Sequence, residues 1–248
     1  PKVTSRCCTL QGRQITLTGM SKGSGMICPD MATMLAFVAT DAALPAELLQ
    51  TCLQVAADDS FNAITIDGDT STNDACVLIA TGTAGVRLDA TTAADLAVFQ
   101  ETLTGLCQDL ARAIVLDGEG ATKLVEIEVE QAASTAEARQ VGYTIAHSPL
   151  VKTALFAADP NWGRILAAVG RAGIPDLAID AVTLWLGEVC IVRDGGRDPD
   201  YTEAAGQQVM ARPAITIRVV LARGQARARL LTCDLSYDYV KINAEYRS

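Results

Sequence analysis

The stretch Val125-Glu-Ile-Glu-Val-Glu130 alternates apolar and acidic residues, which is the pattern of a β-strand with one buried face and one wet face. Shortly after it, Ser134-Thr-Ala-Glu137 has the spacing of a capping box and predicts a helix that runs toward Ala146. A strand followed at once by a helix indicates that sheets and helices share a core. We therefore expect an α+β fold in which mixed sheets are packed with helices.

Further helices and strands are predicted on both sides of this stretch. Residues 92–115 give the clearest helix, with an apolar stripe of Leu96, Phe99, Leu103, Leu106, Leu110 and Ile114. Cap and proline signals predict other helices, which begin near Pro45, at Ser148-Pro149 and at Asn161, the last of them stopping at Gly173. Strands are expected at about 181–193, 214–222 and 226–233, the last two paired as a hairpin across Arg223-Gly224-Gln225.

Length and composition exclude several classes of protein. The chain has 248 residues, half of them apolar, which is enough to bury a substantial core. Its formal net charge is −9 and its basic residues form no cluster, so we expect no nucleic-acid partner. Charges such as Asp41 and Asp58 interrupt every apolar stretch before the roughly 18 residues of a membrane span. Residues 1–6 lack the apolar core of a signal peptide, so we expect a cytoplasmic protein.

The eight cysteines and the single histidine give no sign of a metal site. No two cysteines are spaced as C-x-x-C, and most lie in apolar runs, as Cys52 and Cys190 do, where cysteine acts as a small apolar residue. His147 lies at the predicted end of a helix, and we interpret it as structural or surface-exposed. We therefore expect no metal.

Two polar segments look like ligand-binding loops but fail the templates. Gly23-Ser-Gly-Met-Ile-Cys28 has Cys where a dinucleotide fingerprint needs Gly or Ala. Asp67-Gly-Asp-Thr-Ser-Thr-Asn-Asp74 has Thr where a calcium loop needs Gly, and no closing Glu. Taken alone, the second segment is a hydrogen-bonded turn, and Thr33, in the apolar run 31–37, is an ordinary strand threonine.

A resemblance to a known family assigns a function to these segments. Lys22-Gly-Ser-Gly-Met-Ile-Cys-Pro-Asp-Met-Ala-Thr33-Met-Leu resembles the self-cleavage segment of the ornithine acetyltransferase family, the bifunctional glutamate N-acetyltransferases of arginine biosynthesis. Together the matching blocks cover essentially the whole chain. Besides that segment they are Asp67–Asp74, Asp117-Gly-Glu-Gly-Ala-Thr-Lys123, Ser148-Pro-Leu-Val-Lys-Thr-Ala-Leu-Phe156, Asp159-Pro-Asn-Trp-Gly-Arg-Ile-Leu166 and Cys233-Asp-Leu-Ser-Tyr-Asp-Tyr-Val-Lys-Ile-Asn-Ala-Glu-Tyr246.

The resemblance implies a precursor that cuts itself between Ala32 and Thr33. Residues 1–32 would then be the C-terminal end of an α chain, and residues 33–248 a β chain. The family fold is an α/β sandwich, related to an aminopeptidase, whose cut chains stay intertwined in an α2β2 assembly. Thr33 would supply both the nucleophilic hydroxyl and, through its freed α-amino group with a reference pKa of about 7.7–8.0, the base. This combination explains how an acyltransferase can work without a catalytic histidine.

The implied reaction is a ping-pong transfer. Thr33 takes acetyl from N-acetylornithine, ornithine leaves, and glutamate accepts the group. No cofactor is implied, although some members accept acetyl-CoA as donor. The implied substrate-binding residues include a cation that suits a carboxylate and an anion that suits an ammonium; they are Lys22, Thr33, Glu119, Asn243 and Ser248. By composition alone, all except Thr33 would be solvated loop charges or polar tail residues.

The chain also departs from the family pattern. Family precursors carry a longer α segment with a Thr-Gly pair that forms the oxyanion hole, so we expect that segment to be a separate partner or the turnover to be impaired. Cys28 and Asp30 precede the cut where small or amide residues are expected. Two alternatives stay open: an N-terminal-nucleophile aminopeptidase that gives the acyl group to water, and an uncut, inactive binding or assembly partner. The motif Asp159–Arg164 is interpreted as a structural turn and cap.

Overall fold

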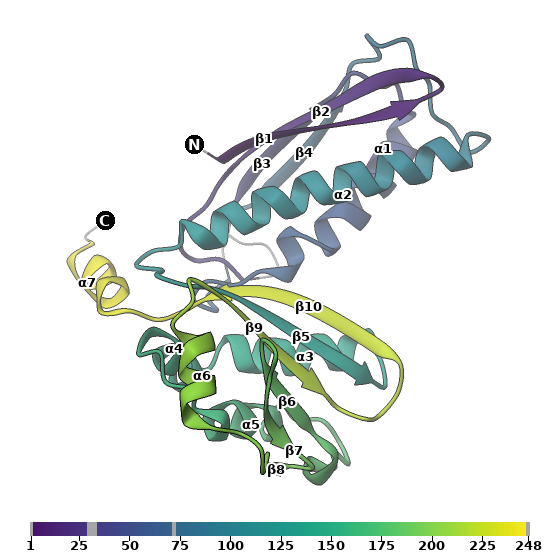
Figure 1. Cartoon of the computed structure of the whole chain (residues 1–248). Helices are drawn as coiled ribbons and strands as arrows, with labels where there is room; N and C mark the ends of the chain where they lie inside the picture. The colour runs from purple at the N-terminus through teal and green to yellow at the C-terminus, as the bar shows by residue number, and fades with distance from the viewer. Residues whose placement is uncertain (1, 29–33, 71–72, 247–248) are drawn as a thin grey trace. The chain divides into compact units, whose positions relative to one another are not determined.

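The computed structural model of the chain describes residues 2–28, 34–70 and 73–246. They form two units, the first made of Pro1–Ile64 and Asp69–Ile114 and the second of Thr65–Gly68 and Val115–Ser248 (Figure 1). Each unit contains a mixed β-sheet with its own helices. The expected α+β class, with mixed sheets packed with helices, is confirmed.

In the first unit the sheet has the order β1-β2-β3-β4. The first two strands form a hairpin because Gln11 and Gly12 both adopt positive φ angles, 51° and 72°, which suit the twist of a two-residue turn. The third strand is antiparallel to β2, and β4 is parallel to β3. The strands are β1 (Lys2–Leu10), β2 (Arg13–Lys22), β3 (Leu35–Thr40) and β4 (Ala75–Ala80).

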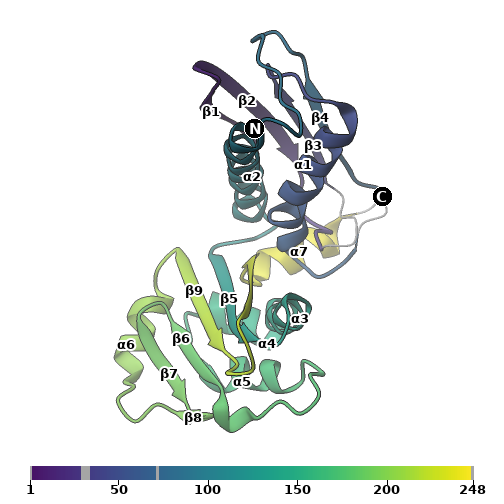
Figure 2. The same ribbon diagram turned by 90° about the vertical axis from the view of Figure 1, so that its right-hand side faces the viewer.

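Helices α1 (Ala46–Asp58) and α2 (Ala93–Leu116) belong to this unit (Figure 2). The short 3-10 helix η1 (Phe61–Ala63) belongs to it as well. The predicted stripe of α2 is buried at Phe99, Leu103, Leu106, Leu110 and Ile114, whereas Leu96 is half-buried. It packs against the sheet, since Leu106 and Leu110 lie against Gly19 of β2. Pro45 is the N-cap of α1, one residue earlier than the predicted position at its first turn.

The other face of this sheet carries a row of exposed apolar side chains. Val3, Met20, Phe37 and Val77 are register partners across the four strands, each facing the next. Their exposed fractions are 55%, 52%, 45% and 39%. Leu35 and Ile79 are also exposed on β3 and β4. A continuous apolar face of this kind on a sheet is a feature of surfaces that another polypeptide covers.

In the second unit the sheet order is β10-β5-β9-β6-β7-β8. The predicted strand at 125–130 is confirmed, with Val125, Ile127 and Val129 buried. Helix α3 (Thr135–Ala146) packs closely on β10, because a Cβ on Gly142 would overlap Leu230. The strands are β5 (Leu124–Ala132), β6 (Thr183–Leu186), β7 (Val189–Arg193), β8 (Gly196–Arg197), β9 (Ala214–Val220) and β10 (Ala226–Cys233).

The predicted pairing of the last two strands is wrong. β5 lies between β9 and β10, parallel to β9 and antiparallel to β10. The connection wraps around the end of β5, where the N–H groups of Arg223 and Gly224 both donate to the carbonyl of Gln131. The hairpin prediction assumed that strands close in sequence pair with each other. Here β5 bonds along both of its edges and is a central strand, so it separates β9 from β10. The predicted strand 181–193 is also interrupted, by a turn at Gly187.

The caps predicted for three helices are confirmed. The hydroxyls of Ser134 and Ser148 accept from the N–H groups of Glu137 and Val151, and the Asn161 side chain accepts from that of Arg164. Sequence reasoning missed α6 and α7, although Thr202 and Ser236 cap them in the same way. The helices of this unit are α3 (Thr135–Ala146), α4 (Pro149–Phe156), α5 (Trp162–Gly170), α6 (Glu203–Met210) and α7 (Tyr237–Glu245), with the 3-10 helix η2 (Ile179–Ala181).

Candidate functional site

The predicted cleavage bond itself, between Ala32 and Thr33, lies outside the described residues, as do Asp30 and Ser248. The residue that follows Thr33 is held at both of its backbone groups. The N–H of Met34 donates to Oδ1 of Asp74 at 2.7 Å, and the carbonyl of Met34 accepts from the N–H of Ala75 at 3.1 Å. Asp74, the last residue of the polar 67–74 turn, therefore anchors the chain directly after the predicted nucleophile.

Lys22 lies in the first unit at the end of β2. Its register partner is Leu35, the first residue of β3, two positions after Thr33. Its side chain is exposed, whereas Cys28, in the loop that follows, is buried. The sheet register therefore brings one predicted substrate-binding residue beside the strand that starts after the predicted nucleophile.

Glu119 and Asn243, both in the second unit, are in direct contact. Asn243 donates a hydrogen bond from Nδ2 to Oε2 of Glu119 at 3.0 Å and another to the carbonyl of Tyr239 at 3.0 Å. Glu119 is half-buried and Asn243 is exposed. The fold thus joins two predicted substrate-binding residues that are 124 positions apart. A carboxylate can accept hydrogen bonds from an ammonium, and an amide beside it can donate to a carboxyl or carbonyl oxygen.

The turn that carries Glu119 is shaped by Gly120, which has a φ of +67°. A Cβ at this position would overlap the N–H of Tyr239 and lie 2.7 Å from Oγ of Ser236. The same Ser236 hydroxyl donates to the carbonyl of Gly120 at 2.6 Å and accepts from the N–H of Tyr239 at 3.3 Å. Glycine is therefore needed for the turn to lie against the N-terminus of α7.

Asp234 holds the other side of the turn. It is buried, and its carboxylate accepts from the N–H and the hydroxyl of Thr122, at 2.8 and 2.5 Å, and from the N–H of Lys123 at 2.9 Å. Sequence reasoning did not single out Asp234 or Ser236. Both lie in the C-terminal block that resembles the family, and a cap signal at Ser236 could have identified the start of α7.

His147 is the C-cap of α3 and lies over the turn at Gly68. Its Nε2 is 3.2 Å from Oγ1 of Thr65. Burial lowers the pKa of the imidazole, and the nearby cation of Lys152 lowers it further, whereas Asp67 opposes the shift. These contacts support the interpretation of His147 as structural.

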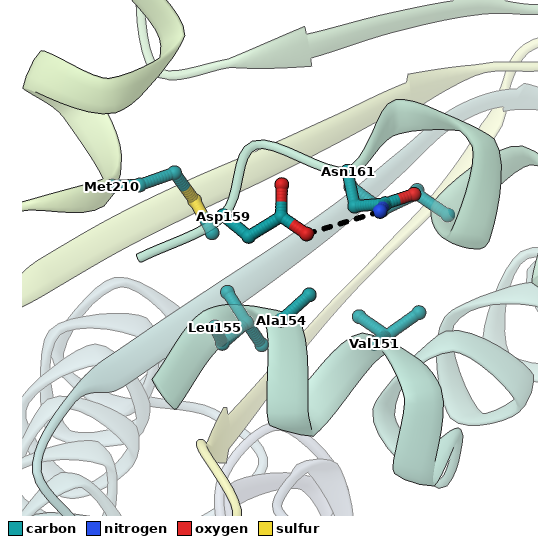
Figure 3. Close-up of a pocket in the computed structure, with 7 residues that line it drawn as sticks. Val151, Ala154, Leu155, Asp159, Asn161 and Met210 are labelled. Atoms are coloured by element: carbon teal, nitrogen blue, oxygen red, sulfur yellow. Dashed lines mark hydrogen bonds between the residues drawn. The ribbon is translucent and has the colours of Figure 1, made fainter. Parts of the chain in front are cut away.

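The motif at 159–164 acts as a turn and cap, as predicted. Figure 3 shows Asn161 donating to Oδ2 of Asp159, at 3.0 Å, while its oxygen caps α5. The close-up also shows that mostly apolar side chains line the small cavity beside this turn; they include Val151, Ala154, Leu155 and Met210.

Across residues 2–28, 34–70 and 73–246, no three His, Cys, Asp or Glu side chains converge where they could hold a metal ion. The eight cysteines form no disulfide. In the part of the chain that the structure describes, no helix is both long and apolar enough to cross a membrane.

Comparison with known proteins identifies close relatives. The chain is 60% identical over 248 residues to the arginine biosynthesis bifunctional protein ArgJ of Methylococcus capsulatus. It is 54% identical over 249 residues to the protein of the same name from Pseudomonas fluorescens. Both matches cover 100% of this chain but only 61% and 62% of the relatives, so the chain spans about three-fifths of their length.

A solved structure and a family model extend this result. The crystal structure of the arginine biosynthesis bifunctional protein ArgJ of Bacillus halodurans matches with a TM-score of 0.80 and 40% identity. The match covers 85% of this chain and 98% of the solved chain. The model of the ArgJ family matches residues 1–248. This chain belongs to the ArgJ family.

Proposed function

We propose that the protein is a glutamate N-acetyltransferase, which moves acetyl from N-acetylornithine to glutamate through an ester on Thr33. The observation that carries the proposal is the hydrogen bond between Glu119 and Asn243, since it joins two side chains that the resemblance had independently assigned to the substrate. Membership of the ArgJ family and the names of the two relatives point to the same role in arginine biosynthesis.

The active form arises by self-cleavage. The hydroxyl of Thr33 attacks the carbonyl carbon of Ala32, the peptide C–N bond breaks, and an ester forms with a free α-amino group on Thr33. Water then hydrolyses the ester, which leaves a carboxylate on Ala32 and a free hydroxyl on Thr33.

Transfer then follows in two steps. The α-amino group of Thr33 takes the proton of Oγ, which attacks the acetyl carbonyl of N-acetylornithine, and ornithine leaves with the proton. The amine of glutamate then attacks the acetyl ester, the bond between the acetyl carbon and Oγ breaks, and N-acetylglutamate leaves as Oγ takes back a proton through the α-amino group. We assign Lys22 to the substrate carboxylate and Glu119 to its ammonium, with Asn243 and Ser248 as neutral hydrogen-bonding groups. The α-carboxylate is common to N-acetylornithine and glutamate, so Lys22 can serve both, whereas the ammonium assigned to Glu119 is the side-chain ammonium of N-acetylornithine.

The proposed transfer uses no cofactor and no metal, and acetyl-CoA would be an alternative acetyl donor. We assign the protein to the cytoplasm, as an α2β2 assembly. We also assign the oxyanion hole to an upstream segment that the longer relatives carry. The exposed row Val3, Met20, Phe37 and Val77 supports this partner, because a second layer of polypeptide would remove it from water.

The experiment that tests the function uses a precursor extended upstream to the length of the relatives. The mass of the denatured protein should show a fragment that begins at Thr33, and the Thr33→Ala variant should stay uncut. The cut protein should acetylate glutamate from N-acetylornithine. Release of acetate at the same rate without glutamate would instead indicate a hydrolase, and an uncut wild type would contradict the mechanism.

A further inference from the structure

Lys152 is a buried lysine that the reaction above does not use. It lies on α4 with 4% of its surface exposed. Its Nζ donates to Oγ1 of Thr232 at 3.1 Å and to the carbonyl of Cys233, and lies 3.8 Å from the sulfur of Cys233. Lysine is seldom buried unless its ammonium finds acceptors, so these contacts indicate a specific role.

The residues that Lys152 contacts form the end of β10 and the segment that follows. The backbone of Lys152 adds a further contact, since its carbonyl accepts from the N–H of Leu235 at 3.2 Å. Lys152 therefore holds the chain on both sides of Asp234. Burial lowers the pKa of the ammonium, while Cys233, Asp234 and Asp67 act in the opposite direction.

The segment Thr232–Ser236 connects Lys152 to both predicted substrate-binding residues of this unit. Asp234 bonds the backbone of Thr122 and Lys123, directly after the turn that carries Glu119. Ser236 bonds Gly120 and caps α7, which carries Asn243. The separation of Glu119 from Asn243 is thus set by one short segment, and Lys152 holds that segment at Thr232, Cys233 and Leu235.

We propose that Lys152 is a positioning residue for the Glu119–Asn243 pair. Its ammonium fixes the carbonyl of Cys233, and thereby the placement of Asp234 and Ser236, without touching the substrate. An apolar side chain of similar length would fill the same volume but leave that carbonyl without its donor. The inference rests on the proposed function for the identity of the substrate, but not for the placement of α7.

The test uses the extended, cut protein with Lys152→Met. A matched control is Thr153→Val, because Thr153 is the exposed neighbour of Lys152 on α4 and its hydroxyl donates to the carbonyl of Pro149 at 2.7 Å, within the same helix. We expect K152M to raise the KM for N-acetylornithine at least tenfold. The rate at which p-nitrophenyl acetate acetylates Thr33 should change less than twofold, since that ester carries neither an amine nor a carboxylate. T153V should leave both values unchanged.

Hydrogen exchange gives a readout that does not depend on activity. In K152M we expect the N–H of Tyr239 to exchange at least ten times faster, and in T153V at the wild-type rate. Unchanged exchange in K152M would overturn the positioning role, and faster exchange with an unchanged KM would overturn its link to the substrate. If the wild type transfers no acetyl group, the proposed function fails while the exchange result still decides the placement of α7.

A second variant covers the case in which K152M does not fold. Thr232→Val keeps the shape of the buried side chain but removes one acceptor of Lys152. We expect a smaller rise in KM, and the proposal would be contradicted by an unchanged KM or by a twofold or larger change in the rate of p-nitrophenyl acetate acetylation.

Discussion

The side-chain amide of Asn243 donates to the carboxylate of Glu119 at 3.0 Å, which ties the C-terminal helix to a turn from the middle of the chain. Neither residue belongs to the core, since Asn243 is exposed and Glu119 is half-buried. A contact between such residues adds little to stability, because water competes for both groups. Its value lies in a defined geometry for binding.

Asn243→Leu should therefore weaken substrate binding without unfolding the protein. Loss of one hydrogen bond to a charged group corresponds to about 1.5–3 kcal/mol, or roughly a 10- to 100-fold rise in the KM for N-acetylornithine. Steady-state kinetics on the extended, cut protein would measure it. Lys241→Ala, an exposed change on the same helix, is the control and should leave the KM within twofold. An unchanged KM in Asn243→Leu would remove Asn243 from the site.

Gly120→Ala should destabilise the second unit. Alanine is strained at a φ of +67°, and its Cβ would overlap the N–H of Tyr239. We expect a loss of about 2 kcal/mol in the free energy of unfolding, measured with urea. Gly163→Ala is the matched control, since Gly163 lies in the first turn of α5 with only an ordinary contact at 3.7 Å. Equal effects of the two changes would contradict the role of Gly120.

Local signals in the sequence predicted much of the fold. Caps at Ser134, Ser148 and Asn161 and the stripe of α2 were correct because both depend on residues close in the chain. The predicted pairing of β9 with β10 was wrong because β5, which is far from both in sequence, inserts between them and bonds to each. Such long-range choices carry no local signature.

In the candidate site, too, some residues were predicted from the sequence and others were not. Thr33, Glu119 and Asn243 were predicted from the resemblance alone, since no spacing rule links residues so far apart. The supporting groups Asp74, Lys152 and Asp234 were missed. A buried lysine or aspartate is recognised only when its burial is seen, because in sequence both residues read as surface charges.

His147 gives a pH-dependent prediction. Its pKa lies below the ordinary value of 6.5, mainly because burial disfavours the charged ring and also because Lys152 is near. The unfolded chain therefore binds more protons than the folded one between the lowered pKa and 6.5. Stability from this residue is complete above pH 6.5 and is lost as the pH falls through that window.

The chain has a single histidine, so its ring proton gives one resolved NMR signal that can be titrated directly. We expect a midpoint below 6.5 in the folded protein and a rise toward 6.5 in urea. In His147→Gln, the loss of stability between pH 7 and 5 should be smaller than in the wild type. A folded midpoint at or above 6.5 would contradict the burial argument.

Asp74→Ala should slow the proposed cleavage at Ala32–Thr33. The carboxylate accepts from the N–H of Met34 at 2.7 Å, so its removal frees the chain next to the nucleophile. A charged hydrogen bond of about 1.5–3 kcal/mol corresponds to at least tenfold slower cutting, followed by the mass of the denatured precursor over time. Asp74→Asn keeps an acceptor oxygen and should retain more of the rate. Cutting at the wild-type rate in Asp74→Ala would show that the anchor is dispensable.

The exposed row on the first sheet gives a prediction about assembly. Phe37 lies in register between Met20 and Val77, so Phe37→Ser breaks the row at its middle. Because Phe37 is 45% exposed, the change should barely alter the stability of this chain by itself. It should weaken retention of a separately expressed upstream segment at least tenfold in a pull-down, since burial of a Phe side chain supplies about 1.5–3 kcal/mol. Leu150→Ser is the control, since it replaces another exposed apolar side chain, 62% exposed on α4, that lies outside the row. This variant should retain the segment like the wild type. Equal retention by both variants would place the upstream segment elsewhere on the molecule.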